Sequence, residues 1–122
     1  MSKTAPSSPR VFISCGEPSG DIHAAELLLA LNKRRPDLAC SAAAGPSLRA
    51  AGVEEVHGIE KLSVMGFTEV FSALPRALRM LADIKRHLEI ARPAMVILVD
   101  APEFNFRVAR IAYSLGIPAY YY

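Results

Sequence analysis

The stretch MVILVDAPEFN (residues 95–105) runs five consecutive apolar side chains into an acid at Asp100. An unbroken apolar run that ends at a turn signal is typical of a parallel strand covered on both faces. A strand buried so completely has no packing reason to end on a carboxylate. The stretch therefore predicts a central parallel strand, and it makes Asp100 a candidate functional residue.

Helical patterns flank this strand on both sides. The helix predicted after it has one apolar face, which consists of Val108, Ile111, Ala112 and Leu115. Gly116 and Pro118 end that helix, and residues 117–122 begin another strand. The longer helix predicted before the strand is expected to pack on the sheet through a stripe that includes Leu78, Leu81, Ile84 and Leu88. Pro75 is expected to kink this helix or split it in two.

The first half of the chain shows the same alternation. Strand patterns cover residues 10–16, 38–45 and 53–58, helical patterns cover 20–35 and 46–52, and residues 59–67 have the pattern of a loop. Ser19 is the predicted N-cap of the first helix, and Asp21 lies in its first turn. This order predicts an α/β fold, a Rossmann-like doubly wound parallel sheet with right-handed crossovers.

Two loops are expected at the carboxyl ends of central strands, GEPSGD (residues 16–21) and DAPEFN (residues 100–105). Doubly wound sheets bind ligands at these ends, where the strand order reverses. The glycines of the first loop allow close backbone approach, and the helix that follows offers free N–H groups to an anion. The loop matches neither GxGxxG nor a P-loop. From these residues alone, a sugar or phosphate site and a plain strand-to-helix turn both remain open.

The second loop also has two interpretations. Asp100 is either a turn acid beside Pro102 or a general base at the edge of a cleft. Its position after the most apolar strand favours the catalytic role. We interpret Glu103 as a solvated acid and Asn105 as an N-cap of the next helix.

Composition limits the other function classes. The 122 residues, 52% apolar and 21% charged, are those of one globular domain, residues 10–122, behind a flexible tail, residues 1–9. A net charge of +2 without basic–aromatic clusters gives no reason to expect nucleic-acid binding. The start has no signal-peptide pattern, and no apolar run has the length of a membrane span. Cys15 and Cys40 form no CxxC pair and are expected to be free thiols.

Five segments, in this order, resemble the N-terminal part of the lipid-A-disaccharide synthase family over about residues 11–122: GEPSGDIHAAELLLAL, AAAGPSLRAAGVE, EKLSVMGFTEVF, ILVDAPEFNFRVAR and GIPAYYY. The resemblance implies the N-terminal half of a GT-B glycosyltransferase that inverts the configuration of the transferred sugar. Such an enzyme joins UDP-2,3-diacylglucosamine to 2,3-diacylglucosamine 1-phosphate, forming lipid A disaccharide 1-phosphate and UDP.

The resemblance also implies roles for individual residues. It implies Asp100 as the catalytic base, and it implies substrate contacts from Gly16, Glu17, Ser19, Gly20, Asp21 and Asn105. It implies no cofactor and no metal, and the sequence has no DxD motif and only scattered histidines. The loop residues Leu62, Val64, Met65 and Phe67 are expected to contact acyl chains or the membrane. The cationic residues that follow them are Arg76, Arg79, Lys85, Arg86 and Arg92.

The resembling family is larger than this chain and is implied to be cytoplasmic, peripheral on the inner membrane. The chain is therefore expected to be an acceptor-side domain without the nucleotide-sugar domain, and inactive by itself. Two alternatives remain open at this point. One is a non-catalytic Rossmann- or flavodoxin-like module that binds a nucleotide or a partner. The other is a GT-B enzyme with another sugar acceptor.

Overall fold

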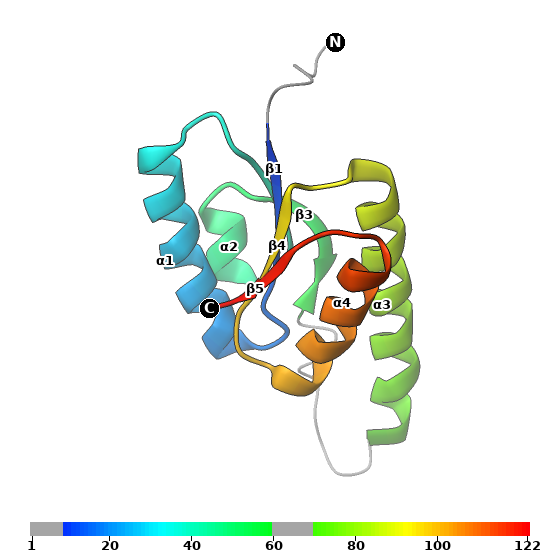
Figure 1. The fold of residues 1–122 in the computed structure, drawn as a ribbon. Helices are drawn as coiled ribbons and strands as arrows, with labels where there is room; N and C mark the ends of the chain where they lie inside the picture. The colour runs from blue at the N-terminus through cyan, green and yellow to red at the C-terminus, as the bar shows by residue number, and fades with distance from the viewer. Residues whose placement is uncertain (1–8, 60–69) are drawn as a thin grey trace.

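One parallel sheet forms the centre of the molecule. The computed structural model describes residues 9–59 and 70–122. Within them the strands are β1 (Arg10–Ser14), β2 (Ala39–Ala44), β3 (Glu54–Gly58), β4 (Met95–Leu98) and β5 (Ala119–Tyr121). Their order across the sheet is β3-β2-β1-β4-β5, and every neighbouring pair is parallel (Figure 1). The predicted parallel sheet is confirmed.

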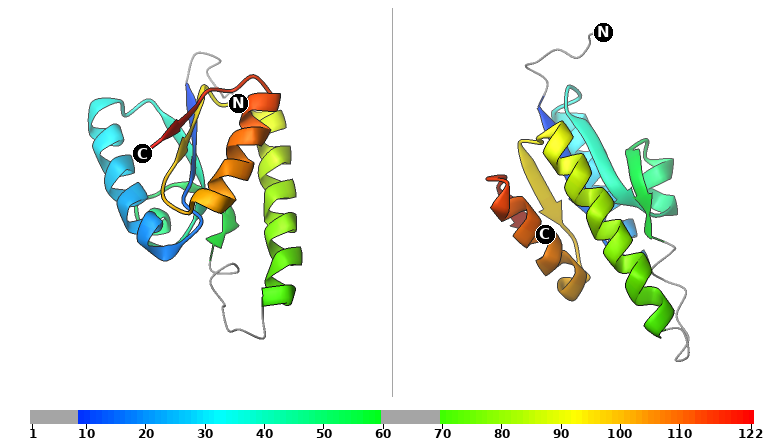
Figure 2. Two further views of the ribbon diagram at one scale, coloured as in Figure 1. Left: turned by 60° about the horizontal axis from the view of Figure 1, so that its bottom comes forward. Right: turned by 90° about the vertical axis from the view of Figure 1, so that its right-hand side faces the viewer.

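Helices cover both faces of the sheet. They are α1 (Pro18–Arg34), α2 (Pro46–Ala50), α3 (Val70–Ala91) and α4 (Pro102–Ser114). The pair α1 and α2 lies on one face, and α3 and α4 lie on the other (Figures 1 and 2). This is the doubly wound arrangement that the alternating patterns predict. None of the helices in the described part of the chain is long and apolar enough to cross a bilayer.

The order of the strands reverses between β1 and β4. From β1 the chain moves outward through α1 to β2 and β3, and it then returns through α3 to β4 on the other side of β1. Ser14 at the end of β1 is in register with Leu98 at the end of β4. The loops that follow these two strands therefore start side by side, at the point where such sheets bind ligands.

The core explains why the central strands are so apolar. Phe12 of β1 and Val96 of β4 are fully buried, because helices cover both of their faces. The helices contribute Leu28 from α1, Ile84 and Leu88 from α3, and Val108 from α4. The predicted apolar face of α4 is confirmed, since its four residues are buried or packed against this core.

The predicted stripe of α3 is partly wrong. Ile84 and Leu88 are buried, and Met80, which the pattern does not include, is buried with them. Leu78 is 53% exposed, because the face of α3 that meets the sheet is rotated from the one the spacing predicts. Of the two outcomes expected at Pro75, the split into two helices is wrong, because α3 continues through it as one helix. The kink stays a prediction. Pro75 lies in the second turn of α3, where it removes one backbone hydrogen bond.

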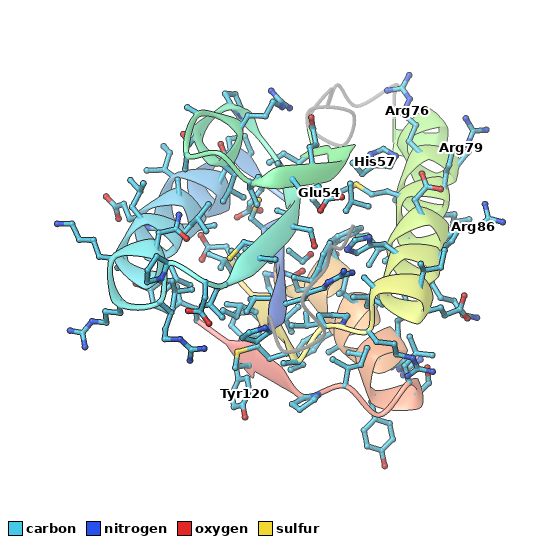
Figure 3. The ribbon with its side chains drawn as sticks, turned by 90° about the horizontal axis from the view of Figure 1, so that it is seen from above. Glu54, His57, Arg76, Arg79, Arg86 and Tyr120 are labelled. Atoms are coloured by element: carbon cyan, nitrogen blue, oxygen red, sulfur yellow. The ribbon has the colours of Figure 1, made fainter. Side chains whose placement is uncertain are left out.

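Two histidines connect α3 to the sheet. Nε2 of His57, in β3, lies 3.4 Å from a carboxylate oxygen of Asp83 in α3, and the ring points between the two elements (Figure 3). Nε2 of His87 lies 2.8 Å from Oγ of Ser41 in β2. Burial lowers the pKa of His87, Arg10 lowers it further, and Glu54 opposes the shift.

The lowered pKa of His87 predicts a loss of stability in acid. The folded protein favours the neutral ring, so its stabilising effect is complete above the ordinary pKa of about 6.5. It is lost as the pH falls from there toward the lowered value, because the unfolded chain takes up the proton first. We expect the free energy of unfolding, measured in urea, to be lower at pH 5.5 than at pH 7.5. His87→Gln should reduce this difference between the two pH values, whereas His23→Gln, at an exposed position, should not. An unchanged difference in His87→Gln would contradict the assignment.

Candidate functional site at the switch point

The loops after β1 and β4 contact each other directly. The backbone N–H of Val99 donates to the carbonyl of Ser14 at 2.9 Å, which extends the pairing of β1 and β4. Gly16 has a positive φ of 70°, and a Cβ added to it would lie 2.7 Å from Cβ of Ala101. Only glycine satisfies both the conformation and the contact. The structure thus brings the two predicted loops to one edge of the sheet, beside each other.

Asp100 has an unusual backbone conformation. Its φ is 53°, and the φ of Ala101 is 44°, so two consecutive residues with side chains are left-handed. This conformation costs about 1–2 kcal/mol for each such residue, and it persists only where the surroundings enforce it. The side chain of Asp100 is half-buried. Within residues 9–59 and 70–122, its carboxylate has no hydrogen-bond or ion-pair partner, which leaves it able to accept a proton from a ligand.

Two side chains hold the carbonyl of Asp100. Nδ2 of Asn105 donates to it at 2.7 Å, and the hydroxyl of Tyr121 donates to it at 2.6 Å. The donors come from α4 and from β5, so two separate elements enforce the left-handed turn. We infer that this double contact fixes the direction in which the Asp100 side chain leaves the backbone.

Asn105 joins the two strands as well as the loop. It is fully buried, its Oδ1 accepts from Oγ of Ser14 at 2.6 Å, and its Nδ2 also donates at 3.1 Å to the carbonyls of Ser14 and Val99. The prediction that Asn105 caps the next helix is wrong, because α4 already begins at Pro102. Its polar atoms are all occupied by protein groups, so its role in the described structure is to position the loops.

Tyr121 is a site residue that the sequence analysis misses. Its pKa is raised, first by partial burial and then by the negative charges of Asp100 and Glu17. Its hydroxyl therefore lies in the field of carboxylates from both loops. The available signal was the position of the last strand, since a strand beside β4 ends at the same edge of the sheet.

Asp21 is buried, and its carboxylate contacts the start of α2. Its carboxylate accepts backbone N–H groups of Gly45 at 3.0 Å, Ser47 at 2.8 Å and Leu48 at 3.1 Å, which all lie at the start of α2. A carboxylate in this position compensates the free N–H groups and the positive end of α2. We assign Asp21 a structural role and do not include it among the residues proposed to touch substrate.

The remaining residues of the first loop divide into exposed and buried ones. Glu17 and Ser19 are exposed, and Oγ of Ser19 donates to the Glu17 carboxylate at 3.4 Å. The predicted N-cap at Ser19 is wrong: Glu17 is the cap residue, and Pro18 is the first residue of α1. Proline is favoured there because its fixed φ suits a helix and its missing N–H costs no hydrogen bond. Glu103, in the first turn of α4, is exposed as expected.

Gly20 lets α1 approach the ends of β1 and β4. A Cβ there would lie 3.0 Å from the carbonyl oxygen of Cys15 and 3.1 Å from that of Val99. We therefore expect Gly20→Val to lower the free energy of unfolding by about 1–3 kcal/mol, because the backbone atoms in contact cannot move aside easily. Ala30→Val, at an exposed position of α1, is the control for the branched side chain. Equal urea midpoints for Gly20→Val and the parent would contradict the packing role.

Cys15 is a buried thiol beside the first loop. Cys15 and Cys40 are both free thiols, as predicted, and Sγ of Cys15 donates to the carbonyl of Ala43 at 3.3 Å. Burial and the nearby Asp21 charge raise the pKa of Cys15 to about 12, so it stays protonated at neutral pH. No group of three or more His, Cys, Asp or Glu side chains suited to a metal ion occurs among the described residues.

The fold and the two adjoining loops define an α/β protein of the doubly wound, Rossmann-like class, with its candidate site at the switch point. The model of the lipid-A-disaccharide synthetase family matches residues 11–122. The chain belongs to this family, as the resemblance of its segments predicts.

Curated relatives show how much of such a protein the chain represents. A lipid-A-disaccharide synthase of Myxococcus xanthus is 45% identical over 114 residues, which are 93% of this chain and 30% of that protein. That of Nitrosococcus oceani is 43% identical over 95% of this chain and 30% of its own length. Lipid-A-disaccharide synthase 1 of Legionella pneumophila is 44% identical over 96% and 31%. The chain thus spans about a third of the length of these relatives.

Proposed function

We propose that residues 10–122 form the acceptor-side domain of an inverting glycosyltransferase that makes lipid A disaccharide 1-phosphate, with residues 1–9 as a tail. The observation that carries the proposal is Asp100, whose free carboxylate leaves a doubly held left-handed turn beside the first loop. Membership of the lipid-A-disaccharide synthetase family supports it. A module that only binds a partner would not need this strained turn for its function.

The proposed reaction is one displacement. The 6-hydroxyl oxygen of the diacylglucosamine 1-phosphate acceptor attacks the anomeric carbon of the UDP-diacylglucosamine donor. The bond from that carbon to the UDP oxygen breaks, and UDP leaves with the electron pair. Asp100 takes the hydroxyl proton as general base, an effect worth roughly 10²–10⁴ in rate. A single displacement inverts the anomeric centre and needs no second carboxylate.

We propose that the first loop touches the sugar or its phosphate. Glu17 and Ser19 are exposed in this loop, and Gly16 presents its backbone beside Ala101. Gly20, Asp21 and Asn105 support these contacts from within the protein. The UDP part of the donor is proposed to be bound by residues of the full-length enzyme that correspond to the part of the relatives outside the matched segment. The chain by itself is therefore expected to show no turnover.

We further propose peripheral contact with the cytoplasmic face of the inner membrane, where both acylated substrates are held. The loop residues Leu62, Val64, Met65 and Phe67 lie outside the described residues. Beyond them, Arg76, Arg79 and Arg86 are exposed and project from α3 away from the sheet (Figure 3). Each such charge near an anionic leaflet can add about 1 kcal/mol to binding.

Replacing Val64 and Met65 together by Ser is expected to weaken binding to anionic vesicles. Apolar side chains that insert at the interface add to the electrostatic attraction, so their loss should be visible in vesicle sedimentation. Ala30→Ser on α1 is the control, since α1 covers the other face of the sheet. Equal sedimentation of the folded double variant and the parent would contradict lipid contact by the loop.

A chimera tests the proposed activity. In it, residues 10–122 replace the matching segment of the Myxococcus xanthus relative, which is 45% identical over 114 residues. We expect the chimera to form the disaccharide and UDP in equal amounts from the two acylated substrates, as measured by mass spectrometry. A folded chimera that binds the donor but releases no disaccharide would contradict the proposal.

A further inference from the structure

A groove lies between α3 and α4. Its volume is about 590 Å³, within the range of about 300–1,000 Å³ that is usual for small-molecule sites. The apolar residues of its lining are Ala77, Leu78, Leu81, Phe104 and Phe106. Leu78 is 53% exposed and Phe106 is 66% exposed, so neither side chain is buried in the core. Two large, exposed apolar side chains that line the same open groove indicate an apolar ligand.

The charged side chains that line the groove indicate the chemical class of its ligand. Arg107 and Arg110 of α4 line the groove, and within the described part of the chain neither forms an ion pair. Glu103 is the acid in the lining and lies at the end of α4 closest to Asp100. An apolar channel with two available guanidinium groups fits an amphiphile that carries a phosphate.

Phe104 connects the groove to the first loop at the switch point. Its side chain lines the groove, and its Cδ2 would lie 3.3 Å from a Cβ added to Gly16 in the first loop. Asp100 precedes Phe104 by four residues and lies just before α4 begins at Pro102. A ligand whose sugar lies over the two loops can therefore extend into the groove past this one ring.

We propose that the groove binds an acyl chain of the acceptor lipid, with Arg107 and Arg110 near its phosphate. This rests on the proposed function for the identity of the ligand. The chemistry of the acceptor supports the placement: with the 6-hydroxyl at Asp100, carbons 1 to 3 lie on the far side of the ring. The phosphate on carbon 1 and the acyl chain on carbon 2 are attached to neighbouring atoms, so both project from the part of the sugar that lies away from Asp100.

Direct binding of simple amphiphiles tests the groove without any sugar or nucleotide. The ¹⁵N-labelled chain is titrated with octyl phosphate and decyl phosphate below their micelle concentrations, with decyl maltoside as the neutral comparison. We expect amide shifts in the α3 and α4 segments that line the groove. The affinity should rise about fourfold for each added methylene, or more than tenfold from octyl to decyl. Shifts elsewhere, or equal affinity for both chain lengths, would overturn the proposal.

Two variants test the apolar and the charged part separately. Ala77→Trp fills the groove and should weaken decyl phosphate binding at least tenfold, whereas Ala30→Trp, on the other face of the sheet, should not. The pair Arg107→Gln and Arg110→Gln changes only exposed groups, so it is expected to fold. It should weaken decyl phosphate binding and leave decyl maltoside binding unchanged. An unchanged phosphate affinity would remove the arginines from the site.

The last experiment tests whether the groove binds the acceptor. In the chimera, Ala77→Trp should raise the KM of a long-chain acceptor severalfold more than that of a short-chain acceptor. An equal effect on both, with amphiphile binding lost, would show that the groove holds some other apolar ligand. Because amphiphile binding is measured without turnover, failure of the groove and failure of the proposed reaction give different results.

Discussion

Replacing Asp100 by Asn is expected to lower the turnover of the chimera by about 100-fold or more. Asparagine keeps the shape and the backbone contacts of the aspartate, since the carbonyl that accepts from Asn105 and Tyr121 is unchanged. It cannot accept the proton of the 6-hydroxyl, so the loss should appear in kcat rather than only in KM. Initial rates at saturating concentrations of both substrates measure it.

A neighbouring acid provides the control for this variant. Glu103 follows Asp100 by three residues, is exposed and lies in the first turn of α4. Glu103→Gln removes the same charge from the same loop and should change turnover far less. If Asp100→Asn keeps turnover within a few-fold of the parent, the base must be another group.

The second large effect is expected in stability, from Asn105→Leu. Leucine is close to asparagine in size but cannot form any of its four hydrogen bonds. The carbonyls of Ser14 and Asp100 keep other donors, Val99 N–H and Tyr121. The Ser14 hydroxyl and the Val99 carbonyl would be left without a partner, at about 1–3 kcal/mol for each buried group. We expect the free energy of unfolding to fall by about 2–6 kcal/mol.

Urea unfolding of the 122-residue chain measures this loss. Asn32→Leu is the matched control, because Asn32 lies on α1 and forms no hydrogen bond through its side chain within the described residues. It should change the free energy of unfolding by less than about 1 kcal/mol. A similarly small change in Asn105→Leu would mean that the two loops are held by other contacts.

Most of the fold could be predicted from local patterns. The continuous apolar run at Met95–Val99 and the alternation of strands and helices suffice to predict a doubly wound parallel sheet. The predictions were wrong where contacts between elements decide which residue is buried or which residue begins a helix. The spacing on α3 marks Leu78 as a core residue, but the orientation of α3 against the sheet buries Met80 instead. Likewise, Ser19 has a favourable N-cap side chain, but the turn at Glu17 begins the helix earlier.

The candidate site was predictable in position but not in its supporting contacts. Parallel strands end at one edge, so the loops after β1 and β4 were expected to meet, and they do. The roles of Asn105 and Asp21 depend on partners 91 and 24 or more residues away, which no local pattern contains. Tyr121 was missed because three consecutive tyrosines look alike in the sequence. Only the pairing of β5 with β4 selects the one whose hydroxyl reaches Asp100.

The most direct test of the account is binding of the acceptor to this chain. The measurement is a ¹⁵N NMR titration of the 122-residue protein with a water-soluble, short-chain diacylglucosamine 1-phosphate. We predict saturable shifts that are concentrated in residues 15–20 and 100–105, the two loops at the switch point. Unchanged amides in both loops at the highest acceptor concentration, or shifts confined to the opposite edge of the sheet, would contradict it.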